Sequence, residues 1–217
     1  MQTIDISMPR ADVRWGAALG LLQAGFSLRA PAGMSARAFM REALGFPDAY
    51  IEGAVSTVFI DDSPVDDIDA ARLVEGSRIA LSAAMPGLVG AVMRRHSPYA
   101  ALRESISYRE GEGGAGGGGG RVVGNDRAAG EGRGGGGGGG AAPAPEVRVG
   151  VKLFNSVMVD RGPEVLARGI YLEGQRAVEA LQDLGLDGAS PAVAELAVAV
   201  TTGTMAELFL RICEVFS

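Results

Sequence analysis

The sequence has almost none of the side chains that form disulfides or bind transition metals. Cys213 is the only cysteine and His96 the only histidine in 217 residues. One cysteine excludes an intramolecular disulfide, and one cysteine with one histidine cannot supply the four ligands of a structural zinc site. Any Cys–His or Ser–His catalytic pair would need His96, and no serine lies in a G-x-S-x-G motif. The sequence therefore predicts a non-enzymatic protein, with no catalytic residue, metal site or cofactor.

The sequence also lacks an excess of positive charge and long apolar runs. Its 20 basic and 26 acidic residues give a net charge of −6, whereas nucleic-acid partners are engaged by clustered positive charge. The most apolar run, 191–202, contains Glu195 and is shorter than the roughly 20 residues of a membrane-spanning helix. The first residues lack the basic start and apolar core of a secretory signal. We therefore expect a soluble, cytoplasmic protein that binds neither nucleic acid nor membranes.

Glycine is abundant, but mostly in one place. Residues 111–140 hold 18 of the 34 glycines. Their long runs are unlike the spaced glycines of a phosphate-binding loop, which lies between a strand and a helix. A segment of this kind has little to bury and high backbone entropy, which predicts a flexible linker. We therefore expect a domain at 1–110, a linker at 111–145 and a second domain at 146–217.

The first 90 residues predict several strands and one capped helix. Alternating apolar residues predict a strand at 2–8, and β-rich runs predict others at 25–30, 55–60 and 78–82, with a brief pairing at Val65. Ser35 is placed as the N-cap of a helix from Ala36 to about Leu44, which Gly45 and Pro47 end. Residues 15–23 fit either a short helix or a continuation of the first hairpin.

This order of elements is that of the β-grasp arrangement of ubiquitin-like proteins. Its central part reads FSLRAPAGMSARAFMREALGF, then VSTVFIDDSPVDD, then LVEGSRIALSAAMPGLVG. These stretches, within residues 25–90, resemble the sulfur-carrier branch of that fold, the thiamine-pathway sulfur carrier and the small subunit of molybdopterin synthase. The resemblance implies an α+β fold with an N-terminal β-grasp domain. Members of that branch end in a free Gly-Gly, whereas this chain continues past Gly90, so its corresponding carboxylate lies in a peptide bond.

The leading functional interpretation is a ubiquitin-like protein-interaction module, linked by the resemblance to sulfur transfer or cofactor assembly. Its sheet, or the tail that follows the last expected strand at 78–82, would bind a protein partner. An alternative is a sulfur carrier that proteolysis activates by exposing a glycine, for example at Gly113–Gly114, because flexible segments are readily cleaved. The candidate interaction residues of the tail are Pro86, Gly87, Gly90, Arg94 and Arg95.

The tail residues also have simpler interpretations. Gly87 and Gly90 fit turn or helix-packing glycines. The basic cluster of Arg94, Arg95, His96 and Arg103 fits a solvated face. A helical extension is expected here, with one apolar face that can pack back onto the sheet. That face consists of Tyr99, Leu102 and Ile106.

Five aspartates at 61–69 form the densest acidic group, and carboxylates can bind a hard cation. The spacing of a calcium loop is absent, and aspartate is common in turns because it hydrogen-bonds nearby backbone. We therefore interpret these residues as turn formers. They are Asp61, Asp62, Asp66, Asp67 and Asp69.

After the linker, residues 147–153 alternate and predict a strand, followed by a short helix from Gly162 and a possible strand at 169–172. A helix is expected at 175–184, the run at 196–200 is a possible strand, and 205–215 is expected to be helical. This order resembles the opening half of a second, degenerate β-grasp. We therefore expect a small α/β domain at 146–217, and a ligand-binding or enzymatic role of that domain is a further alternative.

Overall fold

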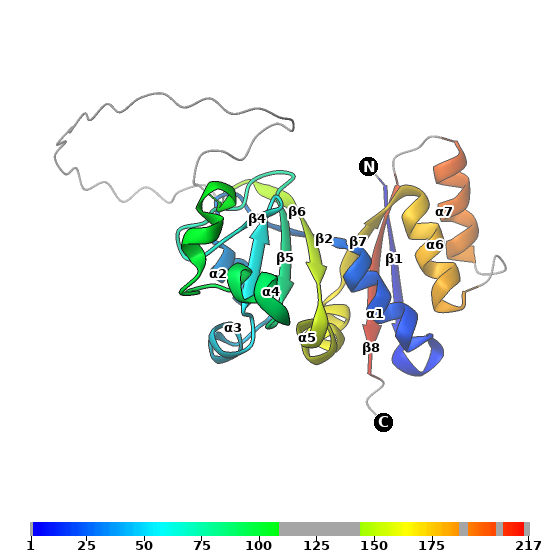
Figure 1. Cartoon of the computed structure of the whole chain (residues 1–217). Helices are drawn as coiled ribbons and strands as arrows, with labels where there is room; N and C mark the ends of the chain where they lie inside the picture. Colours follow the sequence, from blue (N-terminus) through cyan, green and yellow to red (C-terminus); the bar gives the residue numbers. More distant parts are fainter. Residues whose placement is uncertain (1, 109–143, 187–190, 203–205, 215–217) are drawn as a thin grey trace.

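The computed structural model describes residues 2–108, 144–186, 191–202 and 206–214. They form one mixed sheet of eight strands in the order β1-β8-β7-β2-β6-β5-β3-β4 (Figure 1). The strands are β1 (Gln2–Pro9), β2 (Phe26–Pro31), β3 (Thr57–Ile60), β4 (Ser63–Pro64), β5 (Arg78–Ser82), β6 (Glu146–Leu153), β7 (Ile170–Glu173) and β8 (Ala206–Cys213). The helices are α1 (Trp15–Ala24), α2 (Ala36–Glu42), α3 (Asp48–Gly53), α4 (Gly87–Met93), α5 (Asn155–Arg168), α6 (Gly174–Leu184) and α7 (Pro191–Thr201), with 3-10 helices η1 (Arg10–Asp12) and η2 (Ala100–Ile106). None of these helices is long and apolar enough to cross a membrane.

Strand β6 lies between two strands that precede the glycine-rich segment. It pairs antiparallel with β2 and parallel with β5. The expected first strand, at 2–8, is β1, but it pairs in parallel with β8 instead of with β2. The expectation of an N-terminal β-grasp domain and a separate C-terminal domain is therefore wrong, because both halves build one sheet. Most of the linker expected at 111–145 lies outside the described residues.

The C-terminal part also differs from the expectation. Residues 206–213 form strand β8 rather than a helix, and α7 covers the run at 196–200 that was left open as a strand. On β8 the buried apolar side chains are every second residue, namely Leu208, Leu210 and Ile212. Because β8 pairs with both β1 and β7, the chain does not form a second copy of the β-grasp pattern.

Several local predictions are confirmed. Strand β2 lies where it was expected, and the Ser35 hydroxyl caps α2 by accepting from the Ala38 N–H at 3.2 Å. Residues 15–23, which the sequence left open, are helical in α1. Helix α5 begins earlier than expected and includes Pro163. A Cβ at Gly162 would lie within 2.9 Å of the side chains of Leu19 and Leu22, so this glycine allows α1 to approach α5 closely.

The sheet has an apolar and a polar face. Val151 on β6 lies beside Phe26 on β2 and Ile79 on β5, and all three are at most 4% exposed. The buried residues of α1, α2, α5, α6 and α7 belong to the same continuous core as these strand residues. The alternate residues of the strands form the polar face, which includes Arg148 and Lys152. One hydrophobic core therefore spans both halves of the chain.

The polar face contains a carboxylate network that also joins the two halves. Glu207 on β8 is buried and accepts from the Thr3 hydroxyl at 2.7 Å, from Arg29 at 2.5 Å and from Arg148. Both guanidinium groups lie over the Tyr171 ring. Burial alone would raise the pKa of Glu207, but the hydrogen bonds from Thr3 and Arg148 outweigh it and lower the pKa. Glu207 is therefore ionised near neutral pH and connects β1, β2, β6 and β8.

The shared sheet predicts how the chain behaves when it is cut. A protease site placed near residue 126 and then cleaved should leave the two pieces in one particle, because β6 remains paired on both edges. Size-exclusion chromatography with mass detection measures this, and the isolated fragment 144–217 should be unfolded by circular dichroism. Two folded pieces that separate after cleavage would contradict the single sheet.

Replacement of Glu207 by glutamine should destabilise the protein, because it removes the charge that offsets Arg29 and Arg148. At pH 7 the free energy of unfolding should fall by about 1–3 kcal/mol. This is less than for a fully buried ion pair, because both arginines are partly exposed. The folded pKa is depressed, so the contribution of the carboxylate is complete above the unfolded pKa of about 4.3 and is lost as the pH falls through the folded pKa. Urea unfolding should show the gap between wild type and variant closing below about pH 4. Glu195→Gln, on the exposed surface of α7, should change stability by less than about 0.5 kcal/mol.

Candidate functional site

The candidate site is the segment after β5, residues 83–108, which we call the tail. It contains α4 and η2, and it returns to the sheet where the Tyr108 N–H donates to the Pro64 carbonyl at 2.9 Å. Helix α4 and η2 contact each other. The tail is therefore a folded part of the molecule, and the expected helical extension consists of two short helices.

Arg103 holds the tail together. Its side chain is 1% exposed and donates to the Val92 carbonyl at 2.7 Å, to the Arg94 carbonyl at 3.2 Å and to Asp66 at 2.6 Å. A buried guanidinium is tolerated only when its N–H groups are paired. The interpretation of this residue as part of a solvated face is thus wrong, because its side chain fixes η2 against α4.

Arg95 is the second anchor of the tail. Its side chain is 4% exposed, donates to the Ile51 carbonyl at 3.1 Å and lies 3.6 Å from the Glu52 carboxylate. Its backbone N–H donates to the Ser56 carbonyl at 2.8 Å. Desolvation by burial lowers the pKa of this guanidinium, while the charge of Glu52 opposes that change. Arg95 thus connects the tail to α3 and to the segment that leads into β3.

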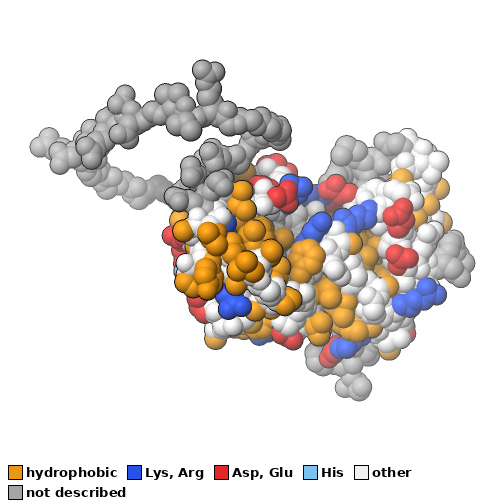
Figure 2. Space-filling view, in the orientation of Figure 1, with side chains coloured by type: hydrophobic (Ala, Val, Ile, Leu, Met, Phe, Trp, Pro, Cys, Tyr) orange, Lys and Arg blue, Asp and Glu red, His pale blue; other side chains and the backbone are white. Residues whose placement is uncertain are grey.

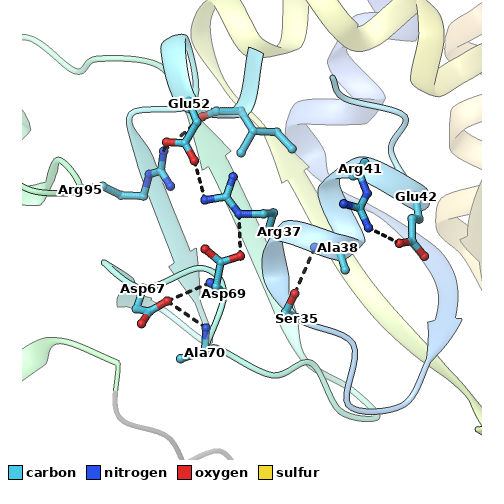
Figure 3. Close-up of polar contacts among 11 residues, drawn as sticks. Ser35, Arg37, Ala38, Arg41, Glu42, Glu52, Asp67, Asp69, Ala70 and Arg95 are labelled. Carbon is cyan, nitrogen blue, oxygen red and sulfur yellow. Dashed lines mark hydrogen bonds and ion pairs between the residues drawn. The ribbon is translucent and has the colours of Figure 1, made fainter. Parts of the chain in front are cut away.

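Beside Arg95, ion pairs join α2, α3 and the aspartate-rich turn (Figure 3). Arg37 lies 2.5 Å from Glu52 and 2.6 Å from Asp69. Its hydrogen bond with Asp69 raises the pKa of Arg37, and the same guanidinium lowers the pKa of both carboxyls. Asp67 accepts from the backbone N–H groups of residues 69 and 70.

The remaining aspartates of the group also have partners. Asp61 accepts from the backbone N–H of Arg78 at 2.9 Å, and Asp62 pairs with the side chain of Arg78 at 2.7 Å. Within the described residues no group of three or more acidic, histidine or cysteine side chains is arranged to hold a metal ion. These carboxylates therefore serve turns and ion pairs.

The five candidate residues of the tail have different environments. Pro86 and Gly87 are exposed, and Gly87 has a φ of +77° at the start of α4. Gly90 is buried, and a Cβ there would overlap the Met85 carbonyl. Arg94 is exposed and makes no ion pair with a described residue, whereas Arg95 is buried. The structure therefore leaves Arg94 available to a partner and assigns Gly90 and Arg95 to holding the tail.

The sequence allowed the apolar side chains of the tail to pack back onto the sheet, but the structure leaves them exposed. Tyr99, Leu102 and Ile106 are 50%, 71% and 50% exposed. Leu88 and Val89 of α4 are each 69% exposed. Eight large apolar side chains are exposed among the described residues, and these five belong to the tail. We call them the tail patch, and Figure 2 shows hydrophobic side chains gathered over the part of the molecule where Figure 1 places α4.

The predicted site residues did not include Leu88 and Val89, although the sequence shows both in a short apolar run. The sequence contained no signal for the orientation of η2, where the charged Arg103 points inward.

Comparison of the chain with protein-family models, with curated proteins and with solved structures gave no match. The glycine end needed by a sulfur carrier, at Gly113–Gly114, lies outside the described residues, so that alternative stays a prediction.

Gly90→Ala should loosen the tail, because the new Cβ would overlap the carbonyl of Met85. Hydrogen exchange followed by mass spectrometry should show faster exchange in peptides from residues 86–108 and unchanged exchange in β2 and β6. Gly16→Ala in α1 is the matched control, since a Cβ there meets nothing within 4 Å. Unchanged exchange in the tail of the Gly90 variant would show that this close approach is not needed.

Proposed function

We propose that the protein is a non-enzymatic interaction module that binds a protein partner through the tail patch. The observation that carries the proposal is the exposure of Leu88, Val89 and Leu102, each about 70%, on a segment fixed by buried arginines. Clustered exposed apolar side chains on a soluble surface are typical of protein-binding sites. A fixed backbone also reduces the entropy lost on binding.

The charges near the patch indicate the chemistry of the partner. Arg94 is exposed at the end of α4 and has no ion pair with a described residue. A partner that fits would present an apolar helix or strand face flanked by a carboxylate, because complementary charge supports recognition and association rate. A link to sulfur transfer or cofactor assembly depends only on the resemblance of residues 25–90 and stays a prediction.

The proposal is tested by capture and direct binding. The full-length chain, the double variant Val89→Ser with Leu102→Ser, and the control Val198→Ser are each used to capture proteins from native extract. Val198 lies on α7 and is 62% exposed, so its replacement changes an apolar surface outside the tail. A captured protein is then purified and titrated against each chain by calorimetry.

The double variant should bind the purified partner at least about tenfold more weakly, as expected for loss of central apolar contacts. The control should bind within twofold of wild type, and Arg94→Glu should slow association most at low salt. Equal binding by wild type and double variant would refute the proposal. So would a purified wild-type chain that dimerises through the patch, since the surface would then bind a second copy.

A further inference from the structure

A cavity of about 330 Å³ lies where strand β2 meets strand β7 in the sheet. Strands β2 and β7 pair at a single position, Ser27 with Tyr171. The cavity lies beside this pairing. Residues of β2, β3, β5 and β6 line one side of it, and residues of β7 and α6 line the other. Its volume is at the small end of the range for pockets that bind organic molecules, about 300–1,000 Å³.

The strand register explains why the polar face is hollow here. One row across the sheet contains Phe59, Ala80 and Lys152, and the next contains Arg78, Gly150 and Ser27, followed by Tyr171 on β7. Small side chains, Ala80, Gly150 and Ser27, therefore form the floor. The aromatic rings of Phe59 and Tyr171 lie at its two ends, and all of these residues line the cavity.

The charges that line the cavity are not balanced. Its two carboxylates are already paired, Asp62 with Arg78 at 2.7 Å and Glu173 with Arg148. Lys152 and Arg176 also line the cavity, are exposed, and make no ion pair with a described residue. Two positive charges without a counter-charge lie beside a floor of small side chains, although the whole chain carries a net charge of −6.

We propose that this cavity binds a small organic anion with a planar apolar body. The body lies on Ala80, Gly150 and Ser27 between the two aromatic rings, and Lys152 and Arg176 bind the anionic group. A planar body fits because the floor lacks projecting side chains and an aromatic side chain lies at each end. A carboxylate fits because guanidinium and ammonium groups form charge-assisted hydrogen bonds with it.

Lys152 provides a direct probe, because it is the only lysine among the 20 basic residues. Reductive methylation with ¹³C-formaldehyde keeps its charge and gives one ε-amine signal in the NMR spectrum beside that of the N-terminus. Titration with 2-naphthoate should move the Lys152 signal in a saturable manner. The neutral analogue 2-naphthylmethanol should bind at least about tenfold more weakly, since it lacks the charge.

Variants then test the position of the site by calorimetry with 2-naphthoate. Gly150→Leu should abolish binding by filling the floor; its Cβ would meet the Arg78 Cγ at an ordinary 3.4 Å, so the backbone is not strained. Ser7→Leu, on the polar face of β1, is the matched control and should bind as wild type does. Arg176→Gln should weaken binding about fivefold to tenfold, whereas Arg168→Gln on α5 should not.

The outcomes separate this proposal from the function proposed for the tail. Loss of 2-naphthoate binding in Leu102→Ser would place the ligand on the tail patch and overturn the cavity site. No saturable shift of Lys152 at millimolar 2-naphthoate, or unchanged binding by a folded Gly150→Leu, would also overturn it. Binding that survives Leu102→Ser and is lost in Gly150→Leu would support it, whatever the result of the capture experiments.

Discussion

The backbone pairing of β6 on both of its edges is the constraint on which the rest of the structure depends. An unpaired edge in the middle of a sheet would leave buried N–H and C=O groups without partners, at a cost comparable to lost hydrogen bonds. With β6 between β2 and β5, each half of the chain completes the sheet of the other. The buried residues of both halves belong to one core, in which Val151 of the second half lies beside Phe26 and Ile79 of the first.

The same constraint positions the polar features. The register of β6 places Arg148 near Glu207 and places Gly150 between Arg78 and Ser27, so one strand sets both the carboxylate network and the floor of the cavity. The tail depends on a different interaction. Buried arginines that bind backbone carbonyls hold its two short helices in place. The large apolar side chains of these helices lie on the surface.

Local signals in the sequence predicted local structure. The Ser35 cap, the β-rich run of β2 and the helix expected at 175–184 each depend on neighbouring residues, and all three are found. The assignment of 205–215 to a helix was wrong, although the apolar residues of β8 alternate in the sequence. Strand pairing could not be predicted, because nothing in β1 distinguishes β2 from β8 as its partner. A long glycine-rich segment suggested a boundary between domains, although a loop of any length can connect two strands of one sheet at modest entropic cost.

The candidate site shows the same limit. Arg94 and Arg95 are adjacent in the sequence and were assigned one role. The backbone directs Arg94 to solvent, whereas the Arg95 side chain is buried and donates to the Ile51 carbonyl of α3. Whether an arginine is a surface charge or an internal anchor depends on which carbonyls surround it. For Arg103 those carbonyls come from a turn that exists only once the tail has folded. Burial of a charged residue is therefore a consequence of tertiary structure, and the exposed apolar patch follows from it, since the side that holds the arginine cannot also hold Leu102.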